Sequence, residues 1–123
     1  MDKRLLYPTR LRKLPPQFSW IDQRLVRDEH LDRLSHTAAA LYLFLSTVAD
    51  KKGFSYYSER SLCRRLRMPV EQLASARAAL VAADLIAYQH PLYQLLSLDA
   101  PPATQRGGIH SLKQIFQLIG AGQ

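Results

Sequence analysis

Apolar positions at helical spacing predict three helices in the middle of this chain. Ser35 stands just before an apolar run over residues 38–48, where its hydroxyl can accept a hydrogen bond from an early amide of a helix. We therefore predict a helix from Ser35 through Asp50. Residues 41–45 leave hardly any polar face, which indicates a helix that is buried on several sides or contacts a partner.

Two further helices follow, separated by a tight turn. Ser58 is a second capping residue, and residues 59–66 form a predicted helix whose Leu62 and Leu66 face inward at i and i+4. We interpret Cys63, beside them, as a small buried apolar residue, with a reactive thiol as the less favoured alternative.

The third helix begins near Pro69, whose missing amide donor suits a first helical turn, and extends to about Ala83. Its apolar face is formed by Val70, Leu73, Ala76 and Leu80. Residues 85–89 and 92–98 are predicted strands of a hairpin, joined by a type I turn with Pro91 at its second position. The expected fold class is mainly α with a small β-hairpin.

A short aromatic segment connects the first two helices. Gly53 ends a turn after the first helix, where it can take a positive φ at low cost, and residues 54–56 are extended. Trp20, Tyr56 and Tyr57 stand next to apolar runs, so we expect them in the core. The alternative is that these aromatic rings stack on unpaired bases.

The chain divides into an arm, a domain and a tail. Residues 1–17 contain three prolines, which remove backbone donors and favour extended conformations. Residues 18–98 hold the domain, which opens with a partly helical segment over 18–34, and residues 99–123 form a linker and a short amphipathic helix. The apolar positions of that last helix are Ile109, Leu112, Ile115, Phe116 and Ile119. We expect it to dock on the domain or to pair with another copy.

Composition and length narrow the class of protein. The 123 residues suffice for one domain, with 47% hydrophobic and 22% charged residues and no apolar stretch that could span a bilayer. A single cysteine cannot form an intramolecular disulfide, and the four histidines lack the paired spacing of a metal site. No nucleophile elbow, phosphate-binding glycine loop or carboxylate pair is present as a motif. We therefore expect a cytoplasmic protein that is not an enzyme and uses no cofactor or metal.

The formal charge of +7 is concentrated in two clusters. Residues 1–13 carry five lysines or arginines against one aspartate, residues 59–67 carry four arginines against one glutamate, and the remaining charges cancel. A basic balance of this kind attracts anionic partners, including nucleic acid.

The order of elements over residues 35–98 resembles the winged helix-turn-helix superfamily. In that family the third helix commonly ends in a leucine, three polar residues, a glycine and a Leu-Ile pair. Leu80, Leu85 and Ile86 stand at the corresponding positions, and Asp84 takes the glycine position. Arg67 stands where the turn between the two helices often has glycine. Because aspartate tolerates the left-handed conformation better than most residues, Asp84 is compatible with the predicted winged-helix fold. More narrowly, the chain is similar to amino-terminal domains of bacterial and phage replication-initiation proteins and to small helix-turn-helix proteins near insertion sequences.

The resemblance implies that the third helix enters the major groove of double-stranded DNA, with the second helix across the backbone. The outward positions of the third helix would be Glu71, Gln72, Ser75, Ala78 and Ala79, with Arg77 close to the boundary between surface and core. Of these positions Gln72, Ser75 and Arg77 can read a base edge. The alternative is that the alanines of this helix, at 74, 76, 78, 79, 82 and 83, permit close packing against another helix.

The second helix is better equipped to contact phosphate. Arg60, Arg64 and Arg67 share a face at i, i+4 and i+7, and Arg65 lies one step around the helix. The alternative is a solvated surface whose arginine stems cover the leucines beneath.

The arm and the hairpin tip offer further basic contacts. Arg10, Arg12 and Lys13 lie among prolines and can occupy a minor groove, or they belong to a solubilising tail. His90 at the hairpin tip can donate to phosphate when protonated, or it is a plain turn residue.

Two functions follow as hypotheses. The first is a DNA-binding protein, either a transcriptional regulator or an accessory factor of replication or of a mobile element. The second is a protein-interaction module that keeps the winged-helix shape. A homodimer through the last helix or the apolar first helix is compatible with both.

Overall fold

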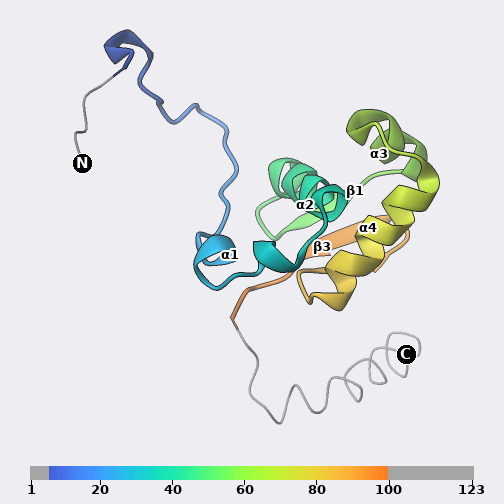
Figure 1. Ribbon diagram of the computed structural model, residues 1–123. Coiled ribbons are helices and arrows are strands. Elements are labelled where there is room, and N and C mark those ends of the chain that lie inside the picture. Colours follow the sequence, from blue (N-terminus) through green and yellow to red (C-terminus); the bar gives the residue numbers. More distant parts are fainter. Residues whose placement is uncertain (1–5, 100–123) are drawn as a thin grey trace.

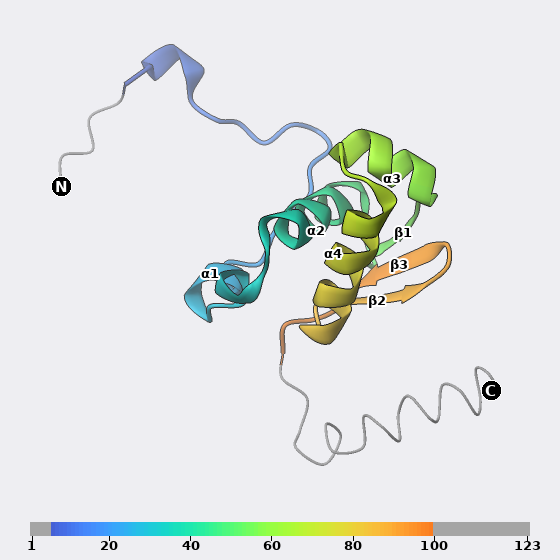
Figure 2. The ribbon, with the colours of Figure 1, turned by 45° about the vertical axis from the view of Figure 1, so that its right-hand side comes forward.

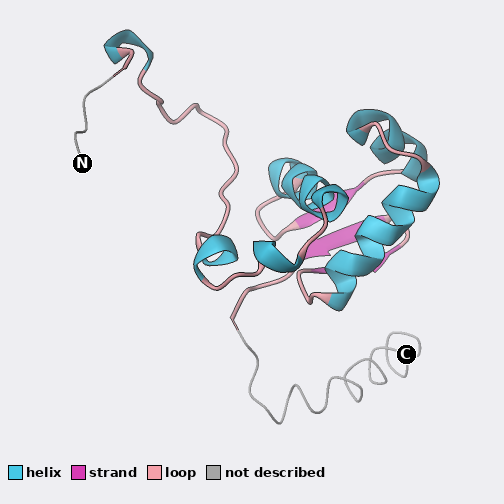
Figure 3. Cartoon of the chain, viewed as in Figure 1, coloured by secondary structure: helices cyan, strands magenta, loops and turns pink. Residues whose placement is uncertain are grey.

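Four α-helices and a three-stranded antiparallel sheet form the part of the chain that the computed structural model describes, residues 6–99 (Figures 1 and 3). The elements are α1 (Arg24–Arg27), α2 (His36–Val48), β1 (Phe54–Tyr56), α3 (Glu59–Leu66), α4 (Val70–Ala82), β2 (Ile86–Gln89) and β3 (Leu92–Leu95), with 3-10 turns at Pro8–Arg10 and Leu31–Arg33. This is the predicted fold class, mainly α with a small sheet. The predicted helix beyond residue 99 lies outside the described residues.

Helix α2 forms the centre of the domain. The Ser35 hydroxyl accepts a hydrogen bond from the Ala38 amide at 3.2 Å, as predicted for its cap. The helix ends at Val48, two residues before the predicted end, and packs against α4 and β3. Leu41 and Leu45 are fully buried, whereas Leu43 faces outward. The expected burial on several sides therefore applies to part of the apolar run.

Helices α3 and α4 are joined by a turn through a left-handed residue. Ser58 caps α3 by accepting from the Ser61 amide at 3.1 Å. Arg67 follows the helix with φ 56° and ψ 50°, and the amides of Arg67 and Met68 both donate to the carbonyl of Cys63. The turn thus takes the backbone conformation for which glycine is the usual residue.

Helix α4 ends in a Schellman motif centred on Asp84, which has φ 65°. The Asp84 amide donates to the Val81 carbonyl and the Leu85 amide donates to the Leu80 carbonyl, both at 3.0 Å. Leu80 and Leu85 are buried, which gives the motif its usual hydrophobic contact. The aspartate therefore occupies the left-handed position that the family pattern gives to glycine.

The sheet has the order β1-β3-β2, and β2 and β3 form the hairpin, which we call the wing (residues 86–95). The pair Gln89↔Leu92 leaves His90 and Pro91 as the two central residues of the turn. Pro91 is therefore the third residue of the turn, with a cis His90–Pro91 peptide bond, and the predicted type I turn is wrong. The strands are also shorter than predicted.

The core lies between α2, α4 and the sheet. Its largest fully buried side chains are Leu41, Leu45, Leu62, Leu73, Leu80, Leu85, Ile86 and Tyr93. Gly53 has φ 90°, as predicted, and its carbonyl accepts from the Leu95 amide at 2.9 Å. A β-carbon at Gly53 would lie 3.2 Å from the Leu95 carbonyl oxygen, so this turn also brings the backbone of β3 close.

Two of the three aromatic residues expected in the core are exposed. Tyr56 is 67% exposed because strand residues alternate between faces, and in β1 it is Ser55 that points inward. Trp20 is 75% exposed, in a segment where every residue from 6 to 21 is exposed. Tyr57 is partly buried and contacts the Phe44 ring edge-on, with 5.1 Å between ring centroids.

The segment before α2 contributes little to the core. Of the expected partly helical stretch, the structure contains the single turn α1 and the 3-10 turn Leu31–Arg33. Leu25 is the buried residue of this segment, and Leu34 is partly buried against the core.

Candidate functional site

Helix α3 presents four exposed arginines, which we call the arginine surface: Arg60, Arg64, Arg65 and Arg67. Leu62 is fully buried, and Leu66 is partly buried four residues later, so these leucines fix the inward face of the helix. With 100° between successive residues, Arg60 and Arg64 lie on the opposite face. Arg67 extends that row just beyond the end of the helix.

Among the residues that the structure describes, the arginine surface has no acidic partner. Within residues 6–99, no carboxylate forms an ion pair with any of its four members, whereas Arg24, Arg27 and Arg77 are each paired with an aspartate or glutamate. An unpaired guanidinium keeps its donors available for an anion, and phosphate is a geometric match for its fork. The described part of the chain therefore concentrates uncompensated positive charge on α3.

Arg65 is oriented by an aromatic side chain. Its guanidinium carbon lies 5.8 Å from the centroid of the Phe44 ring, and the same ring contacts Tyr57. Such a cation–π contact leaves the N–H donors at the edge of the guanidinium accessible. Arg65 is thus held toward α2, to one side of the row that the other three arginines form.

The outward face of α4 has few polar groups. Gln72 and Ser75 are exposed, as predicted, together with Glu71. The remaining outward residues are small or apolar: Val70, Ala74, Ala78, Val81 and Ala82. Ala79, which was predicted to face outward, packs against the core. This helix therefore offers two neutral hydrogen-bonding side chains on a smooth surface.

Arg77, the third predicted base-reading residue, lies inside a cluster. Its guanidinium donates to Glu59 Oε2 at 3.0 Å and to the Tyr93 hydroxyl at 3.1 Å, and lies 4.3 Å from the centroid of the Tyr88 ring. Burial alone would lower the pKa of Arg77, but its hydrogen bonds with Tyr93 and Glu59 outweigh this effect and raise it. The side chain is a permanent cation that contacts α3 and both strands of the wing.

The wing tip lies near the start of α3. The Tyr57 amide donates to the Pro91 carbonyl at 3.4 Å, and α3 begins two residues later. Figure 2 shows the wing and α3 projecting on the same side of the molecule, beside α4. His90 is exposed at the tip, where its Nδ1 lies 3.1 Å from the Tyr88 hydroxyl.

The basic residues of the arm lie apart from this surface in sequence and are exposed. Arg10 ends the 3-10 turn, and Arg12 and Lys13 follow in a stretch without regular structure. Near the domain, the Ser19 hydroxyl donates to the Thr47 carbonyl at 2.8 Å, which attaches the segment to the end of α2.

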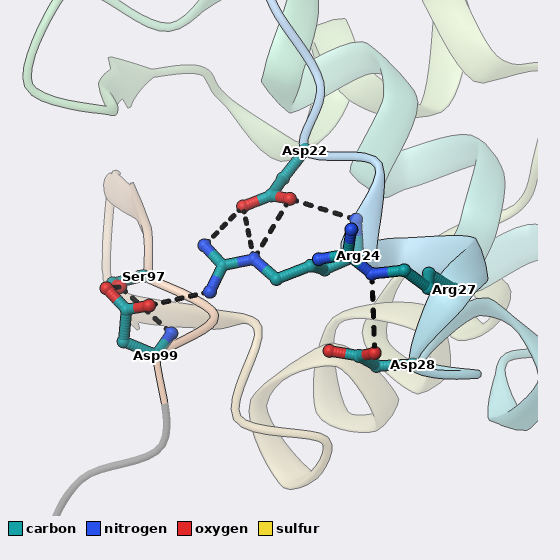
Figure 4. Close-up of polar contacts among 6 residues, drawn as sticks. All are labelled: Asp22, Arg24, Arg27, Asp28, Ser97 and Asp99. Carbon is teal, nitrogen blue, oxygen red and sulfur yellow. Dashed lines mark hydrogen bonds and ion pairs between the residues drawn. The ribbon is translucent and has the colours of Figure 1, made fainter.

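An ion-pair cluster that the sequence analysis missed joins the two ends of the domain (Figure 4). Arg24 contacts Asp22 at 2.6 Å and Asp99 at 2.6 Å, and the Ser97 hydroxyl donates to Asp99 at 2.9 Å. The side-chain hydrogen bond from Arg24, reinforced by its backbone amide, lowers the pKa of Asp22 to about 2. The Asp22-x-Arg24 spacing was a local signal for this pair, but Asp99 is 75 residues away from Arg24.

A groove of about 450 Å³ lies beside this cluster, lined by residues from the segments 18–24, 42–53 and 95–99. Its lining includes three carboxylates and three cations: Asp22, Asp50, Asp99, Arg24, Lys51 and Lys52. The groove therefore has no excess of either charge and does not favour an anionic ligand.

Comparisons with known proteins give one distant likeness. No protein-family model matches the chain, and no curated protein matches it. A solved structure described as "Structure of Rep-DNA complex" aligns with 80% of this chain and 86% of that chain, at 21% identity and a TM-score of 0.46. A likeness this distant does not place the chain in a family.

Residues 6–99 contain no helix that is both long and apolar enough to cross a membrane. In the same range, histidine, cysteine, aspartate and glutamate side chains form no group of three that could hold a metal ion.

Proposed function

We propose that this chain binds double-stranded DNA, mainly through phosphate contacts from α3, and acts by binding rather than by catalysis. The observation that carries the proposal is the arginine surface, four exposed guanidinium groups that no carboxylate within residues 6–99 neutralises. A helix that crosses the DNA backbone needs such donors, and phosphate contacts supply most of the affinity of weakly specific binding.

Base discrimination by α4 is modest in this proposal. Gln72 is the exposed residue of α4 that can form a bidentate contact with adenine, which is worth about 1–3 kcal/mol of discrimination. Ser75 can contact any base, and the alanines around it offer only apolar contact with a thymine methyl group. His90 at the wing tip and the arm residues Arg10, Arg12 and Lys13 add contacts to phosphate or the minor groove.

Such a binding mode is compatible with several biological roles. A small domain with strong phosphate contacts and few base contacts suits a regulator or an accessory factor of replication or of a mobile element. The resemblance to amino-terminal domains of replication-initiation proteins supports the same reading.

A protein partner is the second candidate. It is favoured by the smooth outward face of α4, where Ala74, Ala78 and Ala82 are exposed one turn apart. Small side chains at this spacing permit another helix to approach closely, and such a complex would not need the arginine surface.

The salt dependence of binding tests the proposal. The full chain is titrated onto random-sequence duplexes across a salt series, and each lost phosphate contact should reduce the slope of log affinity against log salt by about 0.9. Replacing Arg64 and Arg65 with glutamine should therefore reduce the slope by about 1.8. Gln72→Ala should change the preference at one base pair and leave the slope unchanged.

A matched control separates local contacts from net charge. Replacing Lys51 and Lys52 with glutamine removes the same number of charges from the turn before β1, away from α3. This control should change the slope much less than the α3 variant. Equal slopes for the two variants would contradict an interface on α3, and the absence of duplex binding by the unaltered chain would leave the protein-partner candidate.

A further inference from the structure

We infer that Arg77 is a positioning residue that sets the wing and α3 at a fixed spacing, so that both contact one duplex. This inference rests on the proposed function and differs from the base-reading role that the sequence analysis gave to Arg77. The Arg77 guanidinium is a largely buried cation. Only 14% of the Arg77 side chain is exposed, and a charge in such a position requires partners.

The partners of Arg77 belong to three different elements. One terminal nitrogen donates to Glu59, the first residue of α3, and the other donates to the Tyr93 hydroxyl on β3. The guanidinium plane also lies over the Tyr88 ring on β2, at 4.3 Å from its centroid. Both terminal nitrogens are therefore occupied within the fold, and a single side chain of α4 connects α3 with both strands of the wing.

The contacts continue from Arg77 to the wing tip. The rings of Tyr88 and Tyr93 lie with their centroids 4.6 Å apart, and the Tyr88 hydroxyl lies 3.1 Å from His90 Nδ1. Tyr93 is 1% exposed, so its hydroxyl depends on Arg77 for a buried partner. The pairing of β1 with β3 holds the backbone to the wing as far as Tyr56, and the Tyr57–Pro91 hydrogen bond that follows is long at 3.4 Å. Arg77 adds to this backbone pairing a side-chain connection from α3 itself to both strands of the wing.

The charge of Glu59 allows a test in which electrostatics and positioning predict opposite changes in DNA affinity. Glu59→Gln removes a negative charge from the helix that carries the arginine surface, so electrostatics alone predicts tighter binding to DNA. A positioning role predicts the opposite, because Arg77 loses its ionic partner and keeps only a weaker, neutral hydrogen bond to α3. Tyr93→Phe removes no charge, and a positioning role again predicts weaker binding.

The experiment measures affinity and salt slope of the full chain for a random-sequence duplex. We expect Glu59→Gln and Tyr93→Phe each to weaken binding about 3- to 10-fold with an unchanged slope. We expect Arg77→Met to weaken binding at least as much, and the double variant Arg77→Met with Glu59→Gln to be no weaker than Arg77→Met alone, because both changes break one connection. Arg60→Gln is the control: it should reduce the slope by about 0.9.

Amide hydrogen exchange supplies a second readout that needs no DNA. Tyr93→Phe and Arg77→Met should speed exchange in β2 and β3 more than in α2, whereas Arg60→Gln should leave both unchanged. Tighter binding by Glu59→Gln, together with a slope reduced by about 0.9 in Arg77→Met, would show that Arg77 contacts phosphate itself and would overturn the inference. Failure of the unaltered chain to bind any duplex overturns the proposed function instead. In that case unchanged exchange in the wing would overturn the connection through Arg77 as well.

Discussion

A glycine at position 67 should stabilise the domain relative to an alanine at the same position. Arg67 has φ 56° and ψ 50°, a left-handed conformation that costs a residue with a β-carbon roughly 1–2 kcal/mol. Glycine escapes that cost but loses about 0.5–1 kcal/mol through the greater freedom of the unfolded chain. The net advantage of Arg67→Gly over Arg67→Ala should be about 0.5–1 kcal/mol in the free energy of unfolding.

The comparison with alanine removes the contribution of the arginine charge. Arg67 is exposed near the carboxyl end of α3, where a cation is favoured by the helix dipole by about 0.3–1 kcal/mol. Both variants lose that contribution equally, so their difference reports the backbone term alone. For a domain of this size, the midpoint of thermal unfolding of Arg67→Gly should exceed that of Arg67→Ala by about 2–8 °C.

Position 64 provides the matched control with the opposite sign. Arg64 is an exposed residue inside α3, where glycine is less favourable than alanine by about 1 kcal/mol. Thermal and urea unfolding, followed by circular dichroism, should rank glycine above alanine at position 67 and below it at position 64. If alanine equals or exceeds glycine at position 67, the left-handed conformation of the turn is not what limits stability there.

Two further changes test the backbone and the ion pairs. Gly53→Ala should destabilise the domain by at least about 1–2 kcal/mol in urea unfolding, because φ is 90° and the new β-carbon would lie 3.2 Å from the Leu95 carbonyl oxygen; an unchanged midpoint would contradict this geometry. Asp22 has a folded pKa lowered from 3.8 to about 2, so its ionised form stabilises the fold above about pH 4, and this contribution is lost as the pH falls from there through 2. The difference in urea midpoint between the unaltered chain and Asp22→Asn should therefore be largest at neutral pH, shrink below about pH 4 and be lost below about pH 2. A difference that grows on acidification would refute the assignment.

Local patterns in the sequence were sufficient where local forces decide the structure. The serine caps at 35 and 58 and the bounds of α3 were predicted from spacing alone, because a cap and its helix lie within a few residues of each other. The same holds for the positive φ of Gly53. Arg67 and Asp84 were recognised as standing in glycine positions, and the structure gives both a left-handed backbone.

Contacts between distant segments could not be predicted in this way. Helical periodicity placed Arg77 close to the boundary between the surface and the core. Its partners, however, are on α3 and on two strands that come together only in the folded chain. Tyr56 was expected in the core because of its neighbours, whereas the pairing of β1 with β3 decided which face it occupies. Whether the arginine surface contacts DNA stays a prediction, since pattern and structure establish only that its charges are exposed and unpaired within the described residues.

The cluster of Asp22, Arg24 and Asp99 has a consequence for how the domain combines with other sequences. It joins the segment where the chain enters the domain to the segment where it leaves, through side chains whose Arg24 Nη1 and Asp99 Oδ1 atoms lie 2.6 Å apart (Figure 4). Domains whose ends meet at the surface can be inserted into a loop of a host protein or permuted, because neither operation has to stretch the backbone. We therefore expect residues 22–99 to accept other flanking segments at both ends without a change in α3, α4 or the wing.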